Sequence, residues 1–190
     1  ATYNQRVENT VDLLLNIELP QLRKVDIGNI RKLKALLSVL ASEVPMLVDP
    51  AKLSTLLGIS RTTLLAYLEY LDEAKLIRRL YSDDLSVKKM QKPDKILMDN
   101  CNLLKVLALK EPNIGTLRET FFCNQLGYQH QVEYSKQGDF LIDHQITFEI
   151  GGQAKEGKQV AAVEKAYIVA DDIEYSYGNK LPIWLFGLLY

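Results

Sequence analysis

Cysteine is scarce in this 190-residue chain, and so are the other marks of a secreted or membrane protein. Its two cysteines, Cys101 and Cys123, fall in segments expected to be helical, which argues against a disulfide framework and favours a reducing compartment, the cytoplasm. The longest apolar run, "LPIWLFGLLY", is far shorter than the roughly 20 residues that span a bilayer. The first residues lack a basic stretch followed by an apolar core, so we expect no signal peptide and no membrane partner.

An excess of charge of either sign is also missing. The formal net charge is −1, so any contact with nucleic acid must come from a local basic patch. The two histidines, His130 and His144, have no cysteine or second spaced histidine close by, which argues against a Cys/His metal centre. With 47% hydrophobic residues, the chain suits one large globular domain or two small ones.

The first half of the chain has the pattern of a winged helix. The apolar face of residues 5–18 predicts a helix that stops at Pro20, and a second helix is expected over residues 28–44. Asp49 and Ser60 are the predicted N-caps of two further helices, "PAKLSTLLG" and "RTTLLAYLEYLDEA", which a glycine turn separates. The segments "KLIRRLYS" and "DKILMD" are then expected to form the hairpin of the wing.

This half also supplies the candidates for DNA contact. The first residues of the second helix of such a motif face the groove, and basic side chains of the hairpin can neutralise phosphates. The alternative is that this run of charges is an ordinary solvated face, as in winged helices that serve in packing or dimerisation. The candidate DNA-binding residues are Arg61, Thr62, Tyr67, Arg78, Arg79, Lys88 and Lys89.

The second half changes character. A short helix, "NLLKVLAL", and a longer one that Thr116 is expected to cap precede three runs rich in β-branched and aromatic residues, "YQHQVEYS", "GDFLID" and "QITFEI". A helix over "GKQVAAVEKA" and a buried strand, "YIVA", are expected to follow. The order α-β-β-β-α-β predicts a mixed α/β (α+β) domain around a central sheet.

Three acids of this half are candidate catalytic groups. Asp139 and Glu149 bound neighbouring predicted strands, and Glu119 lies on the preceding helix. Mg²⁺ prefers oxygen ligands and usually takes one or two carboxylates. Asp139 and Glu149 are therefore the predicted metal ligands, with Glu119 orienting them or the attacking water. The alternative is that all three are solvated ends of ordinary elements.

A metal-dependent nuclease would carry a lysine two residues after the glutamate, but Gly151 stands there. That ammonium offsets charge that develops on the phosphate, and losing one such group typically costs ~10²–10³ in rate. Lys155 and Lys158, at the start of the next predicted helix, are the candidates to reach the same space. Loss of activity is the interpretation that we favour from the sequence.

The same residues form a competing motif. The segment "GQAKEGKQ", residues 152–159, differs by one letter from the phosphate-binding P-loop and follows a predicted strand. A P-loop needs a hydroxyl at its last position to ligate magnesium, whereas Gln159 supplies an amide. We therefore rank this motif below the carboxylate site.

Five blocks, taken in order, carry a family resemblance: "SRTTLLAYLEYLDEAKLI", "KILMDNCNLL", "GTLRETFFCNQL", "GDFLID…TFEIGG" and "LPIWLFGLLY". Together they resemble the carboxy-terminal half of predicted AAA-superfamily ATPases of bacteria and archaea. The resemblance implies a winged helix followed by a restriction-endonuclease-like, PD-(D/E)xK nuclease-like, mixed-sheet domain of unknown function. It aligns Glu119 with a helix-borne acid, Asp139 and Glu149 with the metal-binding pair, and Gly151 with the lysine of the nucleases.

The resemblance leads to a domain assignment and a functional hypothesis. Residues 1–28 would end the ATPase lid, 29–95 would form the winged-helix domain, and 96–190 the nuclease-like domain. The chain is then an accessory module that recognises DNA or a partner, with a degenerate nuclease-like centre. The alternatives are an active Mg²⁺-dependent endonuclease and a winged-helix transcription regulator.

The absence of an initiator methionine fits a piece of a longer protein, whose own ATPase domain would be the partner. ATP with Mg²⁺ is expected in that amino-terminal part, which would bring ATP hydrolysis with it. In this piece we expect no cofactor other than Mg²⁺ at the acids. An oligomer is compatible with this hypothesis.

Overall fold

The structure is a computed structural model that describes residues 1–23, 27–82 and 92–189. It has two compact units: residues 1–79 with 96–112, and residues 80–95 with 113–190. The chain passes from unit 1 to unit 2 at the end of strand β2 (Ile77–Leu80) and returns at the start of strand β3 (Lys95–Met98). This division differs from the predicted domain limits, because residues 1–28 and 96–112 both belong to unit 1.

Unit 1 begins with a helical segment that passes through Pro20. Helix α1 (Tyr3–Leu13) continues as a π-helical turn, η1 (Leu14–Glu18), and then as α2 (Leu19–Arg23). The prediction that Pro20 ends the helix is wrong. Proline lies in the first turn of α2, where a backbone N–H is not needed for the regular hydrogen-bond pattern, and the π turn changes that pattern just before it.

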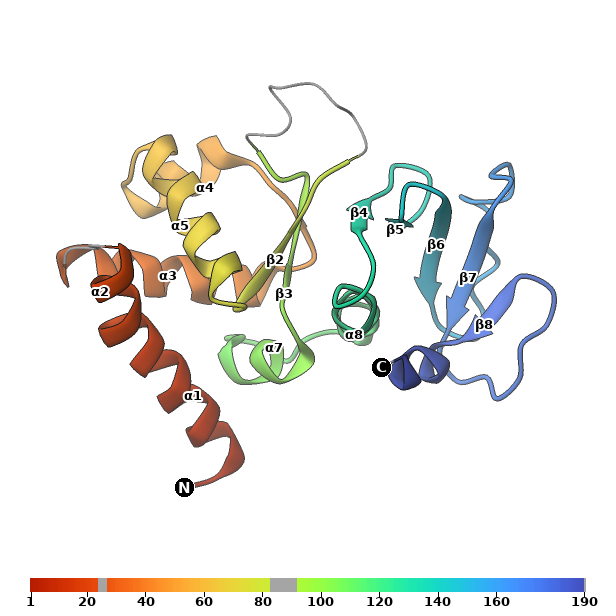
Figure 1. Cartoon of the computed structure of the whole chain (residues 1–190), viewed down its shortest axis with the longest axis horizontal. Coiled ribbons are helices and arrows are strands. Elements are labelled where there is room, and N and C mark those ends of the chain that lie inside the picture. Colours follow the sequence, from red (N-terminus) through yellow and green to blue (C-terminus); the bar gives the residue numbers. More distant parts are fainter. Residues whose placement is uncertain (24–26, 83–91, 190) are drawn as a thin grey trace. The chain divides into compact units, whose positions relative to one another are not determined.

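The rest of unit 1 follows the order expected of a winged helix. Helix α3 (Ile27–Glu43) is followed by β1 (Met46–Leu47), α4 (Pro50–Leu57) and α5 (Arg61–Glu73). The described strands β1, β3 and β2 form a sheet in that order, and α7 (Cys101–Leu107) comes after β3. These elements are coloured orange to light green in Figure 1.

The caps of α4 and α5 confirm the sequence prediction. The Asp49 carboxylate accepts hydrogen bonds from the backbone N–H groups of Ala51 and Lys52, at 3.0 and 3.1 Å. Gly58 ends α4 with a φ of 58°, and the Ser60 hydroxyl accepts from the N–H of Thr63 to start α5. These caps satisfy N–H groups that would otherwise lack partners at the helix starts.

Unit 2 is a mixed α/β structure. Helix α8 (Ile114–Leu126) precedes β4 (Val132–Tyr134), β5 (Phe140–Ile142) and β6 (Ile146–Gly151), which pair antiparallel. Strands β7 (Ala166–Ala170) and β8 (Lys180–Pro182) extend the sheet in parallel, giving the order β4-β5-β6-β7-β8. Asn113, rather than the predicted Thr116, caps α8.

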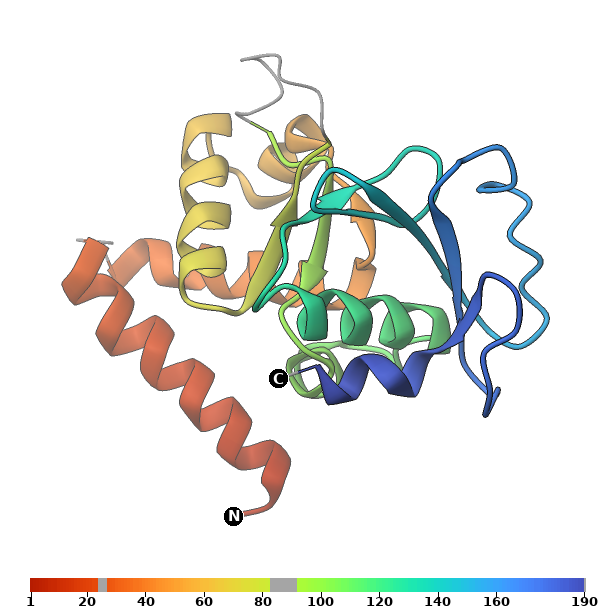
Figure 2. The same cartoon turned by 45° about the vertical axis from the view of Figure 1, so that its right-hand side comes forward.

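The two faces of this sheet are covered differently. On one face Phe122 of α8 packs against Phe140, Phe148 and, in the 3-10 helix η2 (Ile183–Leu188), Phe186. Helix α8 and η2 lie side by side along this face (Figure 2). The other face carries a small cluster of Val160, Ala166 and Ile168 beneath the segment that joins β6 to β7.

That joining segment corrects another prediction. The expected helix over residues 157–166 is absent, and the segment consists of turns and irregular backbone before β7 begins. Gly157 adopts a φ of +68°, and a Cβ there would lie 2.3 Å from the Cδ1 of Ile168. A left-handed residue in such a crowded position interrupts a helix. The apolar residues of this segment instead belong to turns that cover Ile168. The P-loop interpretation, which needs a helix here, is therefore wrong.

Candidate functional site

The register of the sheet brings Asp139 and Glu149 together. Phe140 pairs with Phe148 in the antiparallel β5–β6 ladder, so the next pair outward is Asp139 and Glu149. The backbone N–H of Asp139 donates to the carbonyl oxygen of Phe148 at 2.9 Å, and its carboxylate accepts from the N–H of Ile150 at 2.7 Å. Directly opposed residues share a face of the sheet, so the two acids are neighbours on one face.

Lys155 takes up the position that Gly151 leaves open. Its Nζ lies 2.9 Å from Oε1 of Glu149, whose side chain is 2% exposed. A Cβ on Gly151 would lie 2.7 Å from the Cβ and Cγ of Lys155, so the aliphatic stem of the lysine occupies the space of a side chain at residue 151. An ammonium therefore reaches the glutamate from four residues further along the chain.

Glu119 approaches the site from the helix that covers the opposite face. Residues alternate between the faces of a strand, so Glu149 points away from α8 while Phe148 points towards it. Burial raises the pKa of Glu119; the nearby Lys95 and Lys155 oppose this rise, and the Asp139 carboxylate adds to it. The charges of Asp139 and Lys155 thus act on Glu119 through space, while its carboxylate contacts Lys95.

Two cations of the site were not predicted from the sequence. Lys95 is 7% exposed, and its Nζ lies 2.5 Å from Oε2 of Glu119 and 4.9 Å from the ring centroid of Phe140. The signal available was a lysine that opens an otherwise apolar strand, "KILM". Arg118, beside Glu119 on α8, was also overlooked.

Arg118 lies against the start of the segment that carries Lys155. Its Nε is 3.1 Å from Oδ2 of Asp171 and its Nη2 is 3.4 Å from Oδ2 of Asp172, just after β7. A Cβ on Gly152 would lie 3.3 Å from Nη1 of Arg118. The guanidinium thus lies close over Gly152, and it joins the end of β6 to the end of β7.

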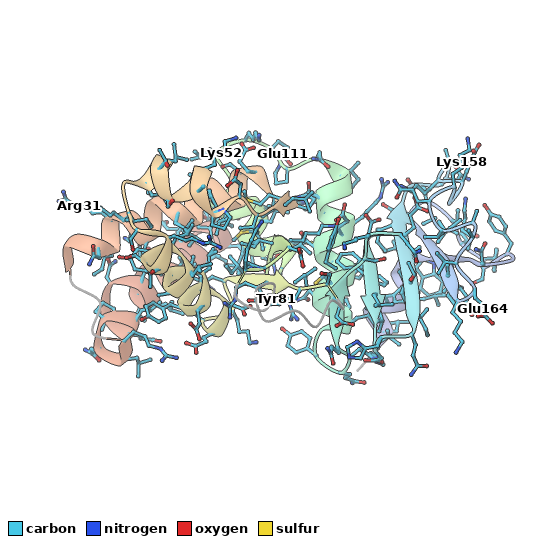
Figure 3. The ribbon with its side chains drawn as sticks, turned by 90° about the horizontal axis from the view of Figure 1, so that it is seen from above. Arg31, Lys52, Tyr81, Glu111, Lys158 and Glu164 are labelled. Atoms are coloured by element: carbon cyan, nitrogen blue, oxygen red, sulfur yellow. The ribbon has the colours of Figure 1, made fainter. Side chains whose placement is uncertain are left out.

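Lys158, the other candidate lysine, is not part of this arrangement. It forms an ion pair with Glu156 at 2.7 Å, in which both side chains are largely exposed. Figure 3 shows it pointing outward at the surface of unit 2. Of the five predicted site residues, Asp139, Glu149 and Lys155 therefore come together, Glu119 lies on helix α8 at the opposite face, and Lys158 lies apart from them.

The residues present fit a single hard cation. The second oxygen of Glu149, Oε2, is buried and has no hydrogen-bond partner among the described residues, and such an orphaned acceptor calls for a water or an ion. Mg²⁺ needs only one or two carboxylates beside water and substrate oxygens. Asp139 and Glu149 would supply them, although the described residues contain no group of three or more His, Cys, Asp or Glu side chains arranged to hold a metal.

The predicted DNA-binding residues of unit 1 differ in their exposure to solvent. Arg61 and Thr62 are exposed in the first turn of α5. Tyr67 is 4% exposed, so its prediction as a groove-facing residue is wrong. It belongs to the buried stripe of Leu64, Leu68 and Leu71, at the helical spacing of three and four residues.

The two predicted DNA-binding arginines of the hairpin, Arg78 and Arg79, are engaged in ion pairs. Arg78 lies 3.0 Å from the buried Asp99, and Arg79 lies 3.0 Å from Asp72. Neither guanidinium is free to neutralise a phosphate without giving up its carboxylate, which disfavours both as DNA contacts. Lys88 and Lys89 lie outside the described residues.

No helix among the described residues combines the length and apolar character needed to cross a bilayer.

Comparisons with known proteins place the chain in a family without assigning an activity. The comparisons with curated proteins and with solved structures found no significant match. The family model described as a domain of unknown function, DUF8612, matches residues 1–113, more than half of the chain. The chain belongs to the DUF8612 family.

Proposed function

We propose that unit 2 is a divalent-metal-dependent phosphodiesterase of the nuclease type, with Asp139, Glu149 and Lys155 as its central residues. One observation carries the proposal: the Lys155 ammonium lies 2.9 Å from Glu149 and its stem covers Gly151. The sequence favoured a degenerate centre because a lysine was missing at residue 151. Lys155 removes the reason for that preference.

Each residue has a defined task in this proposal. Asp139 and Glu149 would hold Mg²⁺, which would neutralise charge developing on the phosphate and orient a water. The Lys155 ammonium would offset the same charge from the protein side. Glu119, whose pKa is raised by burial, is suited to exchange a proton with water bound nearby.

The experiment is a cleavage assay on the full chain with plasmid and single-stranded DNA or RNA, in the presence of Mg²⁺ or Mn²⁺. Asp139→Ala should abolish cleavage. Lys155→Ala should lower kcat by ~10²–10³, the usual cost of losing one preorganised charged group. Lys158→Ala removes an equal charge from an exposed ion pair and serves as the matched control.

A transplanted lysine makes the test specific. In Lys155→Gly the space over Gly151 is vacated, because the Lys155 Cβ that would lie 2.7 Å from a Cβ at residue 151 is removed with the stem, so Gly151→Lys in that background should restore cleavage by placing the ammonium at the nuclease position. Gly151→Lys alone should impair the protein, because its Cβ would meet the Lys155 stem at 2.7 Å. Absence of metal-dependent cleavage, or cleavage unaffected by Asp139→Ala, would refute the proposal.

The second candidate concerns unit 1 and the protein as a whole. We propose that the chain is the carboxy-terminal module of a cytoplasmic AAA-type ATPase, in which unit 1 recognises duplex DNA. The exposure of Arg61 and Thr62 in the first turn of α5 supports DNA recognition, and the family resemblance supports the ATPase context. A protein partner in place of DNA, or a transcription regulator, is the alternative outcome of the DNA-binding test in the Discussion.

A further inference from the structure

Lys180 is a buried lysine that the proposed chemistry does not use. It opens β8, is 8% exposed, and its Nζ donates a hydrogen bond to the carbonyl oxygen of Gln153 at 2.9 Å. Its Nζ also lies 5.4 Å from the ring centroid of Tyr177. Among the described residues, no carboxylate forms an ion pair with it.

A buried ammonium without a counter-ion is costly. Removing a charge from water is rarely repaid by a single neutral acceptor, and lysines are seldom fully buried unless they are paired. Methionine would fill the same space at a lower desolvation cost. The lysine at residue 180 is therefore better explained by the group that it holds, the Gln153 carbonyl, than by packing.

The sheet register places Lys180 on the same side as the acids. Glu149 pairs with Ile168 in the β6–β7 ladder, and Ile168 pairs with Lys180 in the β7–β8 ladder. These three residues form a row across the sheet and share one face. The segment from Gly152 to Lys155 passes over this face, since Lys180 reaches Gln153 and Lys155 reaches Glu149.

This segment is a short turn that is held on two sides. The N–H of Lys155 donates to the carbonyl oxygen of Gly152 at 3.0 Å, which closes the turn. The Arg118 guanidinium lies against Gly152, and Lys180 holds Gln153, the next residue. The direction in which Lys155 leaves the turn depends on both contacts.

We propose that Lys180 is a positioning residue, which fixes the Gly152–Lys155 turn and thereby aims the Lys155 ammonium at Glu149. Its link to catalysis rests on the proposed function of Lys155. Its effect on the geometry of Lys155 does not depend on that function, and this effect can be measured without an activity assay.

The first test measures how well Lys155 is protected. Acetylation of lysines by a water-soluble amine reagent is followed by mass spectrometry in the folded full chain, with the exposed Lys158 as internal reference. Lys180→Met should raise the rate at Lys155 relative to Lys158 by about tenfold, the effect of losing a charge-assisted hydrogen bond. Lys180→Arg, which keeps a donor, should change it little, and Lys165→Met serves as an exposed control.

An unchanged Lys155 rate in a folded Lys180→Met protein would overturn the proposal. Circular dichroism and the melting temperature identify a variant that has lost its fold. In that case Lys180→Gln, which keeps an N–H donor without the charge, replaces it. In Lys180→Gln the acetylation rate of Lys155 should be higher than in the wild type and lower than that of the exposed Lys158.

The second test asks whether Lys180 acts through Lys155. In the wild-type background, Lys180→Met should lower kcat about tenfold with little change in KM, since positioning affects the transition state. In the Gly151→Lys, Lys155→Gly background it should have no effect, because the ammonium no longer comes from the turn. An equal loss in both backgrounds would mean a merely structural role.

The two tests separate the two proposals. If no variant cleaves nucleic acid, the proposed function fails, and the acetylation rates still decide whether Lys180 positions Lys155. If cleavage depends on Lys155 but neither rate nor kcat responds to Lys180→Met, the inference about Lys180 fails alone.

Discussion

Two acids of unit 2, the buried Glu149 and the partly buried Glu119, each contact a lysine, and their surroundings differ. Glu149 is 2% exposed and lies 2.9 Å from the Lys155 ammonium. The Glu119 side chain is 17% exposed and contacts Lys95. Burial raises the pKa of Glu119, and Lys95 opposes the rise without cancelling it. Glu119 is thus a carboxylate that the fold accommodates at a cost.

Glu119→Gln should therefore change the pH dependence of stability. A raised pKa means that the folded chain binds more protons than the unfolded chain at pH values above 4.5, the ordinary value for Glu. The wild type then loses stability as pH rises through this window, and glutamine does not titrate. The unfolding free energy of Glu119→Gln minus that of the wild type should increase with pH there.

Urea unfolding at a series of pH values between 4 and 8 measures this difference. The interaction with Lys95 is already part of the net shift in the pKa of Glu119, so the slope is the informative quantity. Lys95→Met should shift the pH range in which stability falls to higher pH, because it removes a cation that lowers the pKa of Glu119. A difference that falls as pH rises would contradict the assignment.

The carboxylates of the site and Lys155 were among the candidates that the sequence offered, whereas Lys95 and Arg118 were not. Asp139 and Glu149 bound short apolar runs, and strand pairing alone makes them neighbours. Lys155 replaces a lysine at residue 151 only because the chain turns back after Gly152, which no periodicity reveals. Tyr67 was misassigned because a tyrosine at helical spacing from leucines can join the buried stripe as easily as face a groove.

At the scale of elements, the starts of helices were predicted correctly where they depend only on residues of the same turn. Asp49 and Ser60 start α4 and α5 as expected, because a cap needs only its own turn. The predicted helix over residues 157–166 does not form, although the apolar residues there have spacings close to those of a helix. Packing against the rest of unit 2 decides the backbone of this segment, since Gly157 has a positive φ and lies against Ile168.

Gly157→Ala tests this constraint against a matched glycine. Gly178 has a φ of +57° and open space within 4 Å of where an alanine methyl would lie, whereas a methyl at Gly157 would lie 2.3 Å from Ile168. Both substitutions incur the left-handed strain of roughly 1–2 kcal/mol. Only Gly157→Ala adds overpacking, of about 1–3 kcal/mol.

Thermal and urea unfolding of both variants measures the difference. Gly157→Ala should therefore be the less stable of the two, and it should also expose Lys155 to acetylation, because it disturbs the segment that carries the lysine. Equal losses of stability in the two variants would show that the contact with Ile168 does not constrain this segment.

At the scale of the whole molecule, the residues proposed to bind DNA and those proposed to cleave it belong to different units. Unit 1 contains the exposed Arg61 and Thr62, and unit 2 contains the acids with Lys155. The prediction placed residues 29–95 in one domain, with its limit where the sequence pattern changes, and residues 96–112 in the other domain. Strands β2 and β3 instead carry the chain out of unit 1 and back into it.

If this division holds, binding and cleavage should respond to different substitutions. Arg61→Ala should weaken duplex DNA binding and reduce the slope of log K against log salt by about one, as expected for one lost phosphate contact. Its kcat at saturating DNA should stay at the wild-type value. Asp139→Ala should show the reverse: cleavage is lost and binding is retained.

Fluorescence anisotropy at several salt concentrations, beside the cleavage assay, measures both effects. Lys52→Ala removes an equal charge from the exposed surface of α4 (Figure 3) and should leave the slope unchanged. Equal effects of Arg61→Ala and Lys52→Ala would mean that DNA senses only the net charge of unit 1. Absence of binding at low salt would remove DNA as its ligand and leave a protein partner as the alternative, because a phosphate-contacting surface binds most tightly where counterion competition is weakest.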